Sequence, residues 1–226
     1  MKAFFIAGTG TGVGKTLFTC ALAYRLRERK AQVQALKPVI SGFDAERVAE
    51  SDTGQLIAAQ GLPMSQAAVD DISPWRFAAP LSPDMAGEDE RKSIDFDALV
   101  AFCRKKETVD HYLLIEGVGG IMTPLDARHT VLDWAVALKY PVILLSGSYL
   151  GSLSHTLSAA RVITEVGLPL HAVVVSESEN QPAHPARTLA ILQRFLPQKT
   201  RIHLISRLDS GPDLWKYVPE SIIGIL

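Results

Sequence analysis

Residues 8–16 read Gly-Thr-Gly-Thr-Gly-Val-Gly-Lys-Thr, with the apolar run 3–7 before them and an amphipathic pattern over 17–30 after them. This order predicts a strand, a glycine-rich turn and a helix, which surround a phosphate group with backbone N–H groups at a helix N-terminus. An ordinary glycine-rich turn explains the glycines but not Lys15 and Thr16, which in such loops reach the β- and γ-phosphates and hold magnesium. The expected nucleotide-binding residues of this stretch are Gly12, Val13, Gly14, Lys15, Thr16 and Leu17.

The loop departs from the standard Walker A pattern at Thr9, which stands where that pattern has a glycine. Variant loops of the MinD, ParA and nitrogenase iron protein class carry an additional lysine, which would fall at Gly10 or Thr11 here. Neither position holds a lysine. This absence argues against a partner-regulated switch ATPase of that class.

The chain has 226 residues, 47% of them hydrophobic. This length and composition can bury a sizeable core, and no linker or repeat divides the sequence, so we expect one domain over 1–226. The net charge is −1, with no long run of either sign, which indicates no nucleic-acid-binding surface.

The lack of a membrane span or signal peptide in the sequence, together with its cysteine pattern, predicts a cytoplasmic protein. No apolar run approaches the ~18 residues of a membrane span, and the first apolar stretch leads into the phosphate loop rather than a signal-peptide cleavage site. Cys20 and Cys103 lie far apart and form no CxxC motif. Two reduced, buried thiols are the simplest interpretation, and they suit a cytoplasmic protein.

Apolar runs typical of buried strands alternate with helical patterns along the chain, which predicts the α/β P-loop NTPase fold: a mostly parallel sheet of six to seven strands with helices on both faces. Residues 39–42 read as a loop. Residues 65–90 contain three prolines and little periodicity, so we expect an irregular segment with at most short helical turns that covers the substrate. The expected strands are 3–7, 32–37, 112–115, 141–145, 170–175 and 201–205. The expected helices are 17–30, 52–60, 94–106, 130–138, 152–166 and 184–195.

Two carboxylates are candidate partners of a nucleotide-bound magnesium ion. Glu116 ends the buried strand 112–115 and precedes three glycines, a usual place for such a ligand. A solvated loop glutamate is the alternative, which the apolar strand makes the weaker interpretation. Asp52 opens a predicted helix, so the role of helix N-cap explains it equally well.

Other polar groups follow the expected strands. Lys37 ends the second strand, which we expect beside the strand of the phosphate loop, so that the ammonium group reaches the γ-phosphate. An exposed surface lysine is the alternative. Ser41 lies four residues further on, near the same pocket. Gly151 and Ser152 begin the helix after the fourth strand, where they either bind an anion or simply cap the helix.

The sequence contains no histidine cluster with metal-ligand spacing, no Gly-x-Ser-x-Gly elbow and no cysteine nucleophile motif. The expected catalytic groups are therefore cations and a metal ion. Such groups suit phosphoryl transfer to an acceptor that is already anionic, because positioning and charge neutralisation then make a strong base unnecessary.

Seven short motifs, by their order and spacing, resemble those of dethiobiotin synthetase, an ATP-dependent carboxylase of biotin synthesis. The resemblance covers the chain up to about Val175. The motifs are GTGTGVGKT at Gly8, KPVISG at Lys37, SDT at Ser51, PLSP at Pro80, IEGVGG at Ile115, PVILLSGSYLG at Pro141 and SHTLSA at Ser154.

The resemblance implies a seven-stranded parallel sheet and a homodimer with the substrate site at its interface. It implies that 7,8-diaminopelargonate, CO2 and ATP, with Mg2+, give dethiobiotin, ADP and phosphate. One amine takes up CO2 as a carbamate, the carbamate attacks the γ-phosphate, and the second amine closes the ring on the resulting anhydride.

The resemblance also implies roles for single residues. Lys15, Lys37 and Thr11 would be catalytic, the two lysines by neutralising the γ-phosphate and the carbamate. Besides the loop, Glu116 and Ser176 would bind the nucleotide. The implied metal ligands are Thr16, Asp52 and Glu116. The implied substrate-binding residues are Thr11, Lys37, Ser41, Gly151, Ser152 and Leu153, the last three lent by the other subunit at a helix N-terminus.

Two residues and one segment depart from the family pattern. Gly10 stands where the family has an aspartate, and Ser176 where it has an asparagine that reads adenine. The segment 203–206, His-Leu-Ile-Ser, replaces Gly-x-Ile-Pro. Because amide hydrogen bonds to a base edge usually enforce base choice, we expect looser discrimination among nucleotides.

Two other classes remain as alternatives. A switch ATPase of the MinD or ParA type would need a membrane-binding amphipathic helix or a basic DNA-binding face, and the sequence offers neither. Amidotransferase-synthetases of the cobyrinate diamide type carry an attached glutaminase, for which 226 residues leave no room.

Overall fold

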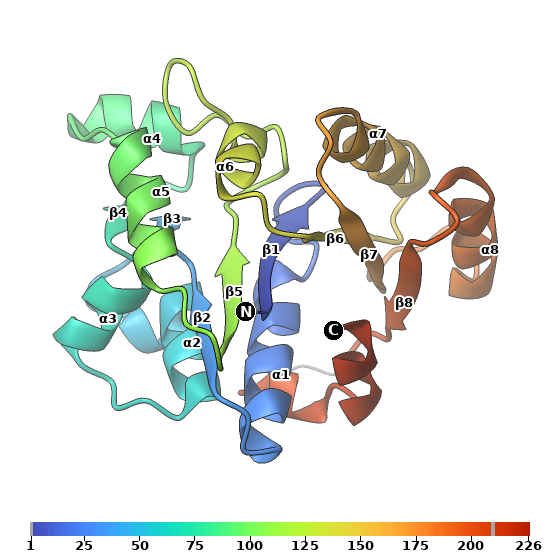
Figure 1. Cartoon of the computed structure of the whole chain (residues 1–226), viewed down its shortest axis with the longest axis horizontal. Helices are drawn as coiled ribbons and strands as arrows, with labels where there is room; N and C mark the ends of the chain where they lie inside the picture. Colours follow the sequence, from blue (N-terminus) through green and yellow to red (C-terminus); the bar gives the residue numbers. More distant parts are fainter. Residues whose placement is uncertain (1, 209–210) are drawn as a thin grey trace.

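The computed structural model describes residues 2–208 and 211–226. Its main sheet has six strands, all parallel, in the order β2-β5-β1-β6-β7-β8 (Figure 1). The predicted α/β fold with a six- to seven-stranded sheet is confirmed. The strands of this sheet are β1 (Lys2–Gly8), β2 (Val33–Leu36), β5 (Tyr112–Glu116), β6 (Val142–Gly147), β7 (Leu170–Ser176) and β8 (Arg201–Ile205).

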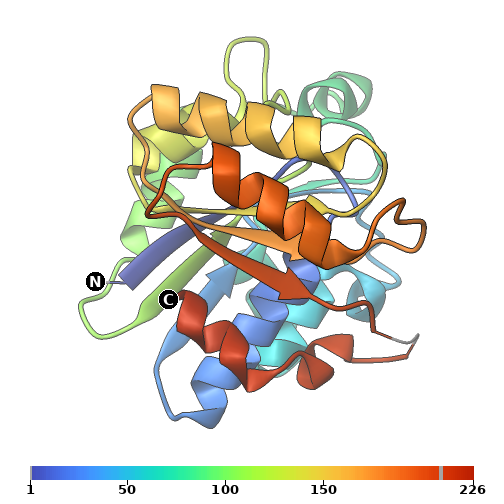
Figure 2. The ribbon, with the colours of Figure 1, turned by 90° about the vertical axis from the view of Figure 1, so that its right-hand side faces the viewer.

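Helices cover both faces of the sheet. The connection from β1 to β2 runs in the opposite direction to the connections from β5 to β6, β6 to β7 and β7 to β8, so its helix lies on the other face from the helices of those three connections. Figure 2 shows α7 and α8 on one face, and α1 with the C-terminal 3₁₀ turns on the other. The helices are α1 (Lys15–Glu28), α2 (Asp52–Gln60), α3 (Gln66–Ile72), α4 (Pro83–Glu90), α5 (Phe96–Lys105), α6 (Val131–Leu138), α7 (Ser152–Glu165) and α8 (Pro185–Phe195).

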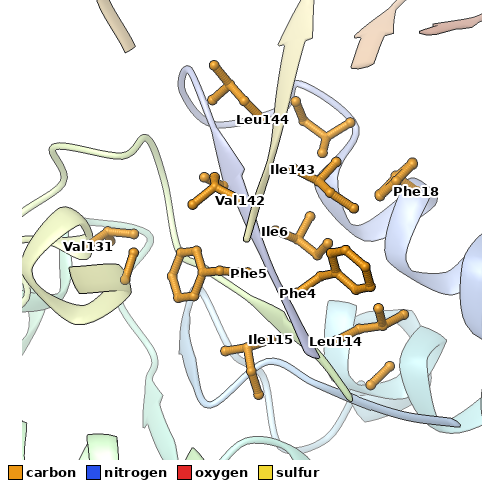
Figure 3. Close-up of a cluster of buried hydrophobic side chains, with 14 of the residues drawn as sticks. Phe4, Phe5, Ile6, Phe18, Leu114, Ile115, Val131, Val142, Ile143 and Leu144 are labelled. Carbon is orange, nitrogen blue, oxygen red and sulfur yellow. The ribbon is translucent and has the colours of Figure 1, made fainter. Parts of the chain in front are cut away.

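The central strand β1 is buried by layers on both sides. Successive side chains of a strand point to opposite faces. Figure 3 accordingly shows Phe5 toward Val131 of α6, and Phe4 and Ile6 toward Phe18 of α1. Phe5 is fully buried and packs against the Trp134 ring in a T-shaped arrangement, with a centroid distance of 5.1 Å. The phosphate loop therefore follows directly from a strand that is tightly packed on both faces.

The prediction that the second strand lies beside the phosphate-loop strand is wrong. The strand β2 pairs with β5, and β5 lies between β2 and β1. Strand order depends on contacts between distant segments, which local patterns do not encode.

The segment 65–90 is more regular than expected. It contains α3, α4 and a short strand, β4 (Trp75–Phe77), which pairs in parallel with β3 (Val39–Ser41) in place of the expected loop. Pro83 stands in the first turn of α4, where proline is tolerated, so it starts that helix instead of breaking it.

The C-terminal residues pack on α1. Two 3₁₀ turns, η2 (Leu214–Tyr217) and η3 (Glu220–Ile225), follow the residues that lie outside the described part, 209–210. Arg25 of α1 donates hydrogen bonds to the carbonyls of Lys216 and Val218, and Trp215 is buried against Tyr24. Within residues 2–208 and 211–226, no helix has the length and apolarity needed to cross a membrane.

Candidate active site

The phosphate loop begins at the carboxyl end of β1. Gly12 and Gly14 have φ angles of 72° and 86°, in the left-handed region that favours glycine. Lys15 is the first residue of α1, and its ammonium group donates to the carbonyls of Gly10 (2.8 Å) and Gly119 (2.6 Å). The loop is thereby tied to the turn that follows β5, and the lysine lies over the loop backbone.

Four side chains from separate elements meet beside this loop. The ammonium group of Lys37, directly after β2, lies 2.6 Å from Glu116 Oε1 and 2.7 Å from Asp52 Oδ2. The Thr16 hydroxyl donates to the same Glu116 oxygen at 2.7 Å. The structure therefore brings together four residues that the sequence selected one by one.

Three alternative interpretations are excluded by these positions. Glu116 is fully buried and Lys37 is 4% exposed, so neither is a solvated surface charge. The N-cap of α2 is Ser51, whose hydroxyl accepts the Gly54 N–H at 3.2 Å, so Asp52 does not cap it. The carboxylate of Asp52 is therefore not used to cap the helix, and it faces Lys37 instead.

Charges in this cluster shift one another's pKa values. Burial, together with the nearby charge of Lys37, lowers the pKa of Lys15 to about 8. Burial alone would lower the pKa of Lys37, but the carboxylates of Glu116 and Asp52 raise it above its ordinary value. Burial alone would raise the pKa of Asp52, but the opposite charge of Lys37 lowers it. Lys37 is therefore a permanent cation at neutral pH.

The donor set of this cluster suits Mg2+. Glu116 Oε2 is buried and has no hydrogen-bond partner among the described residues. With Asp52 and the Thr16 hydroxyl it offers the oxygen ligands that Mg2+ prefers, and such sites are completed by nucleotide phosphates. Among residues 2–208 and 211–226 there is no group of three or more His, Cys, Asp or Glu that could bind a metal unaided. A magnesium ion here would depend on the nucleotide.

A cavity of about 790 Å³ opens over the cluster. Sequence analysis expected Thr11, Lys37 and Ser41 there, and all three line it; the Ser41 hydroxyl is buried without a partner among the described residues. The same cavity has lining residues that were not assigned to the site from the sequence, although the PLSP motif marked four of them. They include Gln55, Pro80, Leu81, Ser82, Pro83 and Thr123.

A second cavity, of about 510 Å³, lies on the other side of the phosphate loop. Its walls include Val13, Leu17 and Ser176, all expected to bind nucleotide. A Cβ built on Gly14 would lie 2.8 Å from the Ser176 hydroxyl oxygen. Glycine at position 14 therefore lets the loop approach the end of β7, and Thr11 lines both cavities.

The N-terminus of α7 stands apart from these groups. The N-cap of this helix is Gly151, with φ 96°, and not Ser152. Among the described residues, no side-chain hydrogen bond caps the helix. Gly151, Ser152 and Leu153 line neither of the two cavities. A third cavity, of about 570 Å³, contains His155 from the next turn of α7 and reaches Thr11. Within one chain, the expected carboxylate-binding residues do not share a cavity with Lys15.

Comparison with known proteins identifies the family. Residues 2–216 match the model of an AAA domain family. An ATP-dependent dethiobiotin synthetase BioD from Methylobacterium nodulans is 44% identical over 200 residues, 86% of this chain and 89% of the relative. A protein of the same name from Acidiphilium cryptum is 43% identical over 198 residues, 87% of this chain and 89% of the relative.

More distant proteins share the fold. A ParA family ATPase from Chlorobium tepidum superposes with a TM-score of 0.56 at 13% identity, covering 98% of this chain and 95% of that structure. At this identity the likeness concerns the fold alone. The sequence identities to the two relatives are the stronger finding, and the family match over residues 2–216 spans the loop, the cluster and both cavities. The chain therefore belongs to the dethiobiotin synthetase family of ATP-dependent ligases.

Proposed function

We propose that this protein converts 7,8-diaminopelargonate, CO2 and ATP into dethiobiotin, ADP and phosphate. The single observation that carries the proposal is the cluster of Lys37, Glu116, Asp52 and Thr16 beside the phosphate loop, in a chain of this family. With Lys15 of the phosphate loop, the cluster supplies two cations beside oxygen ligands, and it contains no histidine that could act as a neutral general base. This chemistry suits an anionic acceptor.

The reaction would proceed in three steps. One substrate amine combines with CO2 and releases a proton to give a carbamate. A carbamate oxygen attacks the γ-phosphorus, the bond to the ADP oxygen breaks, and a carbamic-phosphoric anhydride forms. The second amine then attacks the anhydride carbonyl carbon, expels phosphate and releases its proton, which closes the ring.

The two lysines supply charge in these steps. Lys15 would neutralise the transferred phosphoryl group, as the lysine of such loops does. Lys37 is a cation at neutral pH because two carboxylates raise its pKa, so it would hold the carbamate close to the γ-phosphate. Thr11 and the unpartnered hydroxyl of Ser41 line the same cavity and would orient the diamine or its carbamate.

Thr16, Asp52 and Glu116 would hold Mg2+, which when bound neutralises the charge of the phosphate oxygens. The unpartnered Glu116 Oε2 supports this assignment. The triphosphate would lie on residues 12–17, and the base and ribose in the 510 Å³ cavity near Ser176.

A homodimer would complete the substrate site. Gly151, Ser152 and Leu153 lie at the start of a 14-residue helix, where backbone N–H groups and the helix dipole favour a carboxylate. Since these residues do not share a cavity with Lys15 in their own chain, the same residues of a second copy would bind the substrate carboxylate.

The test is phosphate release with MgATP and bicarbonate, with and without 7,8-diaminopelargonate. We expect release that depends on the diamine and that collapses in Lys37→Ala and Glu116→Ala. Nucleotide binding without any diamine dependence would contradict the ligase assignment. Release that instead requires a protein, membrane or DNA partner would favour a switch ATPase.

A further inference from the structure

Two loops form one side of the 510 Å³ cavity. Residues 177–179 follow β7, and residues 206–208 follow β8. The two strands lie side by side in the sheet (Figure 1), with Ser176 in register with Ile205. The loops therefore leave the sheet at the same end and enclose the space beside the phosphate loop together.

Glu177 fastens these loops to each other. Its backbone N–H donates to the Ile205 carbonyl at 2.9 Å. Its carboxylate accepts the backbone N–H of Arg207 through Oε2 at 2.9 Å, and the side-chain amide of Gln181 through Oε1. One residue thus continues the pairing of β7 and β8 beyond the end of the sheet, and it also braces its own loop.

The loop after β8 needs such a link because β8 is an edge strand. It has β7 as a neighbour on one side and no strand on the other in the described sheet. The loop after β7 has a second support, since Ser148 and Ser178 exchange hydrogen bonds of 3.0 and 2.8 Å between backbone N–H and hydroxyl groups. The wall that includes Arg207 and Leu208 therefore depends on the Glu177 carboxylate.

The protonation state of Glu177 suits this role. The N–H of Arg207, followed by the amide of Gln181, lowers the pKa of the Glu177 carboxyl below its ordinary value. The group is therefore ionised at neutral pH, when hydrogen bonds to a carboxylate are stronger than those to a neutral acceptor.

We propose that Glu177 is a positioning residue for the nucleoside part of the nucleotide: by fastening the 206–208 loop, it holds the wall against which the base and ribose bind. Glu177 acts through Arg207 and its neighbours, and it does not line the 790 Å³ cavity that contains Lys15 and Lys37. The inference rests on the proposed nucleotide site, and it goes further by assigning a residue that acts on one part of the ligand.

The experiment compares a ligand that has a base with one that does not. Binding of MgATP and of magnesium tripolyphosphate is measured calorimetrically for the wild type, Glu177→Ala and Glu177→Gln. In Glu177→Ala we expect MgATP binding to weaken by about tenfold and tripolyphosphate binding to change by less than about twofold. In Glu177→Gln, the amide oxygen still accepts the Arg207 N–H, so most of the ATP affinity returns.

The matched control is Glu179→Ala. Glu179 lines the same cavity but is exposed, and it contacts Arg207 through a side-chain ion pair of 3.5 Å. Exposed pairs contribute little, so we expect less than a twofold change in ATP affinity. KM for ATP should rise in Glu177→Ala while kcat at saturating ATP stays unchanged.

Three results with the variants would overturn the inference. They are unchanged ATP affinity in Glu177→Ala, an equal loss of ATP and tripolyphosphate binding, and an equal loss in Glu179→Ala. A wild-type protein that binds tripolyphosphate and ATP equally would overturn it as well, by removing the nucleoside site. A wild-type protein that binds neither ligand would contradict the proposed function itself, a result distinct from a defect confined to the variant.

Discussion

The ammonium group of Lys37 lies 2.6 Å from a carboxylate oxygen of Glu116, although 79 positions separate the two residues. Lys37 directly follows Leu36 of β2, and Glu116 directly follows Ile115 of β5. Leu36 and Ile115 are opposite each other in the paired strands. Parallel pairing therefore brings them to the same edge of the sheet, at the same height. Both side chains are buried, so each charge depends on the other.

Removing this cation should destabilise the fold as well as the reaction. Lys37→Met leaves Glu116 buried without its main counter-charge, and we expect the free energy of unfolding to fall by about 3–5 kcal/mol. Urea denaturation in EDTA measures the effect. The double variant Lys37→Met/Glu116→Gln should recover most of the loss. A fall of less than about 1 kcal/mol in the single variant would show that the charge of Glu116 is compensated elsewhere.

The Mg2+ requirement of phosphate release should depend on the Thr16 hydroxyl. EDTA should abolish diamine-dependent phosphate release, and Mg2+ should restore it. In Thr16→Ala we expect the Mg2+ concentration for half-maximal rate to rise by about 10- to 100-fold, because one oxygen ligand is lost. An unchanged Mg2+ requirement would remove Thr16 from the metal site.

Nucleotide choice should be loose. A serine hydroxyl rotates and both donates and accepts, so Ser176 cannot distinguish an amino from an oxo group as a fixed amide does. We expect GTP and CTP to support turnover within about 100-fold of ATP, and Ser176→Asn to increase the preference for ATP. An ATP preference of ~1000-fold in the wild type would contradict this prediction.

Two inactive variants should complement each other in a mixed dimer. Lys15→Ala removes the loop lysine, and Gly151→Asp places a negative charge where the substrate carboxylate would bind. A Cβ at position 151 meets only ordinary contact, 3.8 Å from the His155 ring, so Gly151→Asp fits sterically, with some strain at φ 96°. Co-refolded in equal amounts, the two should give roughly a quarter of wild-type activity, since half the dimers contain one intact site. No activity in the mixture would mean that each chain builds its own site.

Stability should depend on the Asp126 carboxylate in a pH-dependent manner. Burial alone would raise its pKa, but hydrogen bonds from His129 and Arg128 lower it below the ordinary value. The contribution is therefore complete above the unfolded-state pKa of about 4 and is lost as the pH falls through the lower, folded-state value. Asp126→Asn should cost about 1–2 kcal/mol at pH 7 and pH 5, and clearly less near pH 3.

Thermal denaturation at the three pH values measures this difference. Asp89→Asn is the control, because Asp89 is exposed. We expect its unfolding temperature to follow that of the wild type throughout. An Asp126→Asn defect that grows toward pH 3 would have the wrong sign.

The sequence was informative where function depends on neighbouring residues. The phosphate loop is contiguous, so its spacing alone located Lys15 and Thr16 on a strand–turn–helix unit. Glu116 was selected by a local signal as well, an acidic residue at the end of an apolar run. For these residues the structure adds distances rather than identities.

Contacts between distant segments could not be predicted in this way. The sequence suggested that Lys37 lies beside the phosphate-loop strand, whereas it lies beside Glu116 on β5. The pairing of β3 with β4 joins residues 39–41 to 75–77, two short segments whose partner no local pattern specifies. The link from Glu177 to Arg207 was equally invisible, because a glutamate in a polar loop carries no distinguishing signal.

The position of β1 has a consequence for biosynthesis. This strand leaves the ribosome before both of its neighbours in the sheet, which are β5, beginning at Tyr112, and β6, beginning at Val142. Translation must pass Val142 before the nascent phosphate loop follows a strand that is paired on both sides. A ribosome stalled before Val142 would therefore carry the complete nucleotide motif on a chain unable to form its binding site.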